Sequence, residues 1–161
     1  MFPTLKGDPT LVNDATPAKH KLGCRFSEAS TGNTYIYILN DSTTSLTAGE
    51  VVMWTNTDGY TVSKDDGTVI AGVSCSRPCG VAVGTIAAAR YGYICVSSRR
   101  ILVKTDGTPV TGNYVVAPDT FDGTVTVLTA DNEQCVVGLV LEQTDPTDDY
   151  NFCEFWAEPS I

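Results

Sequence analysis

Short apolar runs alternate with turn residues along most of this chain. The runs are rich in Val, Ile, Tyr and Thr, which favour strands, and they are separated by Gly, Asp, Asn and Pro. Apolar residues do not repeat at helical spacing over any long stretch. The pattern therefore predicts an all-β domain. Its strands are expected at residues 34–39, 50–54, 68–74, 80–86, 91–97, 100–104, 113–117, 124–128, 134–142 and 151–157.

The spacing of turns favours an antiparallel arrangement. Asp-Gly pairs begin at Asp58, Asp66, Asp106 and Asp122, close to predicted strands, and Asp-Gly suits the tight turns of hairpins. The segment 85–91, with three alanines, is the one helical candidate, and it is too short for more than one or two turns. We expect a compact antiparallel β-barrel or sandwich.

Residues 1–33 lack the strand pattern. They are polar and contain Pro3, Pro9 and Pro17, with little alternation. We interpret them as an extended N-terminal arm, which leaves residues 34–161 as the β body. A terminus without a role is the alternative.

The last predicted strand carries aromatic residues on both faces. Because successive side chains on a strand point to opposite sides, Phe152, Glu154 and Trp156 share one face, and Cys153 and Phe155 share the other. A strand of this kind is expected to be covered on two sides. Phe152, Phe155 and Trp156 are therefore candidate contacts between subunits.

The charge of the chain restricts its partners. The 161 residues fit one domain, and their net charge of −9 opposes binding to nucleic-acid phosphates or to anionic membranes. Residues 1–25 differ, with four basic side chains against two acidic ones. We expect no nucleic-acid or membrane partner, and the arm and the body are expected to contact different surfaces. No secretory signal or membrane span is recognisable, so synthesis in the cytoplasm is expected.

The sequence offers little for catalysis. The single histidine, His20, lies in the proline-containing arm, and no glycine-rich phosphate loop is present. Adjacent acids occur at Asp65/Asp66 and Asp148/Asp149, where a turn-forming role is favoured over paired acid–base work. We therefore predict a protein that is not an enzyme and binds no cofactor. A hydrolase that uses two of these carboxylates is the alternative.

The six cysteines are expected to be reduced, because cytosolic chains seldom keep disulfides. Cys75 and Cys79 are spaced like half of a zinc site, but Cys95 and Cys135 do not form a second pair. A local disulfide is one alternative, and a calcium site in the acidic loop 145–149 is another. The favoured interpretation is free or buried thiols and no metal site.

Aromatic side chains on the predicted strands allow two interpretations. A role in the core or in subunit contacts is favoured, since strands use aromatics for packing, and a platform for stacking on sugars is the alternative. The residues concerned are Tyr35, Tyr37, Trp54, Tyr60, Tyr91 and Tyr93.

The order of turns and strands between residues 46 and 142 resembles a known family. An Ala48-Gly-Glu50 turn opens a strand, Tyr91-Gly-Tyr-Ile-Cys-Val96 follows, and Val137-Gly-Leu-Val-Leu-Glu142 ends the unit. This order is similar to the small β-domain of the decoration, or cement, proteins of tailed-bacteriophage capsids. The segment from Cys75 to Cys79 and the aromatic last strand are not part of that pattern.

The resemblance implies a structural virion protein. Such proteins bind the outer surface of an icosahedral phage capsid as homotrimers and stabilise it by bridging subunits of the major capsid protein. The capsid exterior is the location it implies. A glycan- or receptor-binding β module is the alternative function. The candidate capsid contacts lie in the arm, and they are Phe2, Leu5, Lys6, Leu11, Lys19 and Lys21.

Overall fold

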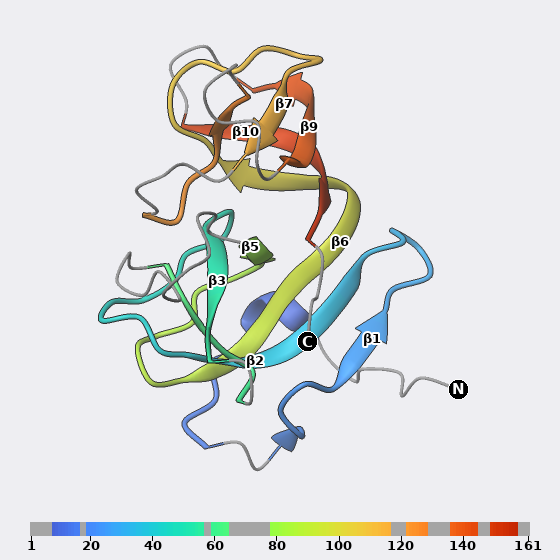
Figure 1. Cartoon of the computed structure of the whole chain (residues 1–161). Helices are drawn as coiled ribbons and strands as arrows, with labels where there is room; N and C mark the ends of the chain where they lie inside the picture. The colour runs from blue at the N-terminus through green and yellow to red at the C-terminus, as the bar shows by residue number, and fades with distance from the viewer. Residues whose placement is uncertain are drawn as a thin grey trace.

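The structure is a computed structural model of the chain, and it confirms the all-β class (Figure 1). It describes residues 8–16, 19–56, 59–64, 78–116, 122–128, 136–144 and 149–157. These residues contain ten strands and no α-helix. The elements are η1 (Pro9–Leu11), a 3-10 turn, followed by β1 (Arg25–Ser27), β2 (Thr34–Asn40), β3 (Val51–Asn56), β4 (Thr61–Ser63), β5 (Pro78–Ala82), β6 (Tyr91–Lys104), β7 (Tyr114–Val116), β8 (Thr126–Val127), β9 (Val136–Gln143) and β10 (Tyr150–Trp156).

Five of these strands close into a barrel. The pairs run from β2 to β4, β3, β5 and β6, and β6 returns to β2. The predicted antiparallel arrangement holds at every pair of the barrel except β2–β4, which is parallel. The cause is the position of β4: the chain turns back from β3 and inserts β4 between β3 and β2, so that β4 runs in the direction of β2.

A second sheet continues from the barrel through the long strand β6. Its C-terminal half pairs with β10, and β9, β7 and β8 follow in that order. We call this the distal sheet, and Figure 1 shows it stacked above the barrel. The sequence predicts two strands, at 91–97 and 100–104, because polar residues lie between them. They form one strand, in which Ser97, Arg99 and Arg100 are exposed while the backbone pairing continues past them.

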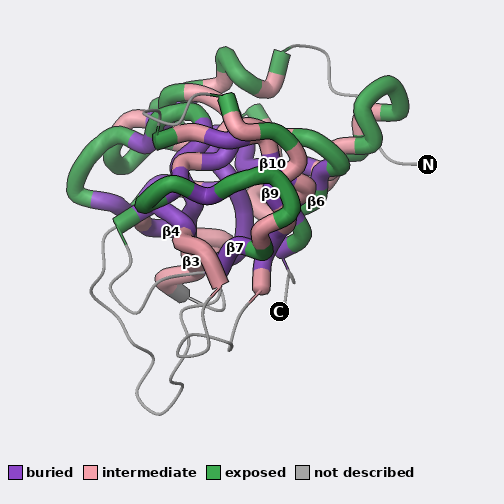
Figure 2. The backbone as a smooth tube through the Cα atoms, turned by 90° about the horizontal axis from the view of Figure 1, so that it is seen from above, coloured by how far each residue is buried: buried purple, intermediate pink, exposed green. Residues whose placement is uncertain are grey.

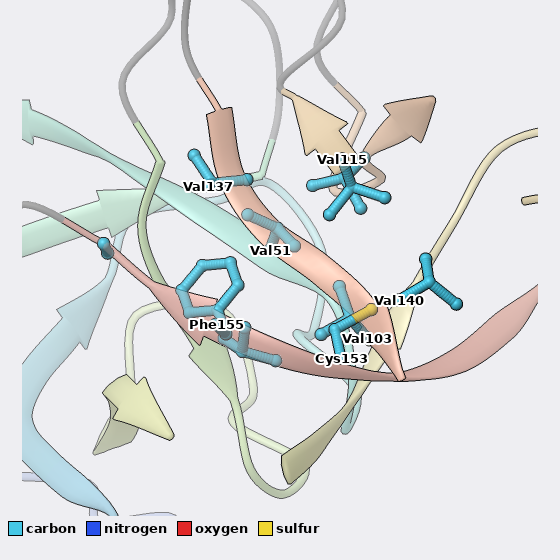
Figure 3. Close-up of a cluster of buried hydrophobic side chains, with 10 residues drawn as sticks. Val51, Val103, Val115, Val137, Val140, Cys153 and Phe155 are labelled. Atoms are coloured by element: carbon cyan, nitrogen blue, oxygen red, sulfur yellow. The ribbon is translucent and has the colours of Figure 1, made fainter. Parts of the chain in front are cut away.

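Two apolar clusters fill the interior. The barrel encloses one, formed by side chains such as Ile36, Ile38 and Ile94. The other joins the end of the barrel to the distal sheet: Val51 and Val81 of the barrel belong to the same cluster as the distal residues Val115, Val137, Val140, Cys153 and Phe155 (Figure 3). Figure 2 shows these buried segments at the centre, surrounded by exposed turns. The barrel and the distal sheet therefore share one core.

The N-terminal segment covers the outside of the barrel. Strand β1 pairs with β2, and Phe26 stacks on Tyr35 with ring centroids 4.7 Å apart and meets the edge of Tyr93 at 5.3 Å. These rings belong to a third apolar cluster, on the outside of the barrel. Of the predicted arm, residues 8–16 and 19–33 are described, and side chains from both stretches pack in this cluster. The division of the chain at residue 33 stays a prediction.

Several local predictions differ from the structure. Gly107 and Gly123 have the positive φ angles, 79° and 88°, that Asp-Gly turns favour. Neither turn forms a two-residue hairpin. Gly107 follows β6, which is not a neighbour of β7 in the sheet, and Gly123 lies in the connection between the paired strands β7 and β8, which is longer than two residues. The helical candidate 85–91 is a turn, in which the Arg90 N–H donates to the Ala87 carbonyl at 3.1 Å. The strand expected at 68–74 lies outside the described residues.

The shared core leads to a stability prediction. Replacing Phe155, which is 1% exposed, by Ala should lower the free energy of unfolding by about 3–5 kcal/mol, because it removes a buried ring and leaves a cavity. The adjacent Trp156, on the other face and 37% exposed, provides the matched control, and Trp156→Ala should cost clearly less. Urea denaturation of both variants measures the difference. Equal losses would contradict the assignment of the two faces.

Candidate interaction surfaces

Of the groups considered for catalysis, His20 and Asp149 lie in the described residues. His20 packs against Tyr37 and Tyr93, with ring centroids 5.2 and 5.7 Å away. Within the described ranges, no three His, Cys, Asp or Glu side chains are grouped so that they could hold a metal ion. Asp65, Asp66 and Asp148 lie outside these ranges, as does the loop 145–149 apart from its last residue. The part of the chain that is described also includes no helix long and apolar enough to cross a bilayer.

The described cysteines are free thiols, and most are inside the protein. Cys79, Cys95 and Cys153 are buried, whereas Cys24 is partly exposed. Burial raises the pKa of Cys95 and of Cys153 to about 12, and that of Cys79 is also well above its ordinary value. These three groups are therefore protonated and unreactive at neutral pH. The other two cysteines, Cys75 and Cys135, lie outside the described residues.

Three of the six aromatic residues considered for a sugar platform are buried, and Trp54, Tyr60 and Tyr91 are partly exposed. Tyr37 and Tyr93 have no exposed surface, and Tyr35 is 5% exposed. Trp54 and Tyr60 pack edge to face, with ring centroids 5.9 Å apart, against the cluster inside the barrel. Tyr35, Tyr37 and Tyr93 therefore contribute to packing and leave no ring face for a ligand.

Strand β10 separates a buried face from an open one. Asn151, Cys153 and Phe155 are buried, while Phe152, Glu154 and Trp156 point the other way and are partly exposed. The alternation expected from the sequence is confirmed. Within the described part of this chain, however, only the first of these faces is fully covered. This difference makes the second face a candidate contact surface.

Neighbouring strands extend this open face. Glu154 of β10 lies opposite Leu139 of β9, and Leu139 lies opposite Tyr114 of β7, which is 50% exposed. Side chains of directly opposed residues share a face of a sheet. We call this surface the outer face of the distal sheet, and it comprises Tyr114, Leu139, Phe152, Glu154 and Trp156.

An ion pair borders the outer face. The Arg100 guanidinium lies 3.7 Å from the centroid of the Phe152 ring and 2.6 Å from the Glu142 carboxylate. Arg100 and Glu142 are each more than half exposed, so the pair adds little to stability. Its effect is to place one charge of each sign beside the aromatic side chains.

The predicted subunit contacts divide between the two faces. Phe155 is part of the chain's own core, whereas Phe152 and Trp156 lie on the outer face. Tyr114 and Leu139 join this surface through strand pairing and were not predicted from the sequence. Alternation along β7 and β9 indicates their direction, but the register that brings them beside β10 cannot be read from either strand alone.

Three of the six predicted arm contacts, Leu11, Lys19 and Lys21, lie in the described residues. Leu11 ends the turn η1 and is 81% exposed, and Lys21 is also exposed. Lys19 is 73% exposed, and its ammonium group lies 2.7 Å from the carboxylate of Asp14, a residue that the sequence analysis did not single out. Phe2, Leu5 and Lys6 lie outside the described residues.

Comparison with known proteins gives a likeness of fold. No protein-family model matches the sequence, and no curated protein matches it. Among solved structures, the chain is similar to the head fiber gp8.5 N base of bacteriophage phi29, with a TM-score of 0.52 and 12% sequence identity. The match covers 79% of this chain and 99% of that chain. This chain therefore contains the fold of nearly the whole base.

Proposed function

We propose that this chain is a non-catalytic structural protein of a phage virion, attached to the outside of the head. The observation that carries the proposal is the likeness of fold to the phi29 head fiber base, which extends over 99% of that base. The strand and turn order of residues 46–142, which resembles that of capsid decoration proteins, supports the same location. The attachment partner on this proposal is the major capsid protein, and the chain bridges its subunits.

The N-terminal segment supplies the proposed capsid contact. Leu11 is the last residue of the turn η1. Asp8 caps this turn, because its carboxylate accepts a hydrogen bond from the Thr10 N–H at 2.9 Å. An exposed leucine on an ordered turn can enter an apolar pocket with little further loss of conformational freedom. Lys19 and Lys21 lie nearby in sequence, with Phe2, Leu5 and Lys6 ahead of the turn.

The contact at Leu11 can be tested with capsids that lack this protein, prepared from the phage that encodes it. Leu11→Ser should weaken co-sedimentation by about tenfold or more, because a leucine side chain that becomes buried contributes about 1.5–3 kcal/mol. Val110→Ser is the matched control, since Val110 is also exposed and apolar but belongs to the loop before β7. If the wild-type chain itself fails to bind the capsids, the proposed function is wrong.

The outer face of the distal sheet is the proposed contact between copies of the chain, which we infer to form a homotrimer. Trp156 and Tyr114 expose apolar surface there, and Arg100 and Glu142 supply one charge of each sign. The whole chain has a net charge of −9, which makes copies repel one another. At the outer face, Arg100 offsets part of the acidic charge of Glu142 and Glu154, so this aromatic surface suits self-association better than the rest of the chain does.

Native mass spectrometry tests this assembly. The wild type should appear as a trimer, and the double change Tyr114→Ser with Trp156→Ser should shift it to monomer, because burial of both rings is lost. Leu11→Ser serves as the control and should stay trimeric. A wild type that remains monomeric at micromolar concentration would rule out self-association through this face.

A further inference from the structure

One buried carboxylate joins the N-terminal segment to the barrel. Asp14 is 7% exposed; its Oδ1 accepts from the Lys19 ammonium group at 2.7 Å and its Oδ2 accepts from the Tyr37 hydroxyl at 2.9 Å. Its backbone forms two hydrogen bonds with Tyr91, of 2.8 and 2.9 Å. Asp14 therefore binds β2 through its side chain and β6 through its backbone.

The residues before Asp14 lie directly against the barrel backbone. We call residues 8–16 the strap. A Cβ atom added to Gly84 would stand 2.0 Å from the Thr10 carbonyl oxygen, and one added to Gly92 would stand 2.9 Å from that of Val12. Such contacts are possible only where the barrel presents glycine. The Asn13 side chain also accepts from the Ala87 N–H at 3.1 Å. The strap can make all of these contacts together in only one alignment along the barrel.

The charge of Asp14 is compensated by its surroundings. Burial raises the pKa of this carboxyl, but hydrogen bonds from Lys19 and Tyr37, together with the charges of Lys19 and His20, outweigh burial and bring the pKa below its usual value. Tyr91 and Tyr93 of β6 and the Cys24 thiol complete the titratable groups around the Tyr37 hydroxyl. Because the folded-state pKa is lowered, this stabilisation is fully present above the unfolded value of about 3.9 and is lost as the pH falls through the folded value.

We propose that Asp14 is a positioning residue: it locks the strap onto the barrel in one register and so fixes where Leu11 is presented to the capsid. The final step rests on the proposed function, whereas the locking of the strap does not. Asn is a poor substitute for Asp14, because it lacks the negative charge that pairs with Lys19 and has one side-chain oxygen to accept from Lys19 and Tyr37, where Asp14 has two.

Hydrogen–deuterium exchange of the full-length protein at pH 7 tests the locking. Asp14→Asn should raise the exchange rate of the strap amides and of the Tyr91 amide at least tenfold, while amides of β9 and β10 stay unchanged. Trypsin should also cleave after Lys19 and Lys21 faster in this variant. Tyr37→Phe, which removes one donor and keeps the ring, should give a smaller effect of the same kind. Lys19→Met removes the other partner of the Asp14 carboxylate and should also raise strap exchange, by less than Asp14→Asn.

A further variant, Gly84→Ala, and a further measurement, capsid binding, distinguish the locking of the strap from the positioning of Leu11. Gly84→Ala displaces Thr10 without touching Asp14, and it should release the strap as Asp14→Asn does. Strap exchange that is unchanged in Asp14→Asn, or that rises equally in the strap and in β9 and β10, would overturn the locking role. A released strap with undiminished capsid binding would overturn the positioning of Leu11. Absence of wild-type capsid binding would instead overturn the proposed function and leave the locking intact.

Discussion

Backbone pairing along β6 holds the two halves of this protein together. Its first residues pair with β2 and β5 and close the barrel, and its last residues pair with β10 and begin the distal sheet. Asp14 also attaches to the first residue of this strand, so the N-terminal strap depends on the same element. Val51 and Val81 of the barrel share a core with Phe155, so apolar packing also joins the two halves.

The sequence predicts those features that depend on local pattern. Alternation along 151–157 indicates which side chains of β10 face the core, and most strands fall within a few residues of their predicted ranges. The parallel pair β2–β4 could not be predicted in this way, because it depends on β4 entering between two strands already placed. Strands β1 and β4 have three residues each, too few for alternation to distinguish them from loop.

The candidate surfaces were predictable to different degrees. Phe152 and Trp156 follow from the period of two along one strand, whereas Tyr114 joins them only through the register of β7 on β9. The residues next to Asp14 in the sequence form no motif that would mark it as a buried carboxylate. Its partners, Tyr37 and Tyr91, are 23 and 77 positions away along the chain, and the contact exists because the segment crosses the barrel beside Gly84 and Gly92. Long-range contacts of this kind depend on the closed fold.

The two proposed contacts belong to different halves that share one core. Leu11 is fixed to the barrel through the strap, and the outer face belongs to the distal sheet, so association through one contact sets the position of the other. A trimer formed through the outer face would hold three straps at fixed separations, and each additional strap that engages a regular lattice would bind at high effective concentration. On the proposed function, weak individual contacts at Leu11 would then be sufficient for stable attachment. The same geometry would let one assembly contact neighbouring capsid subunits.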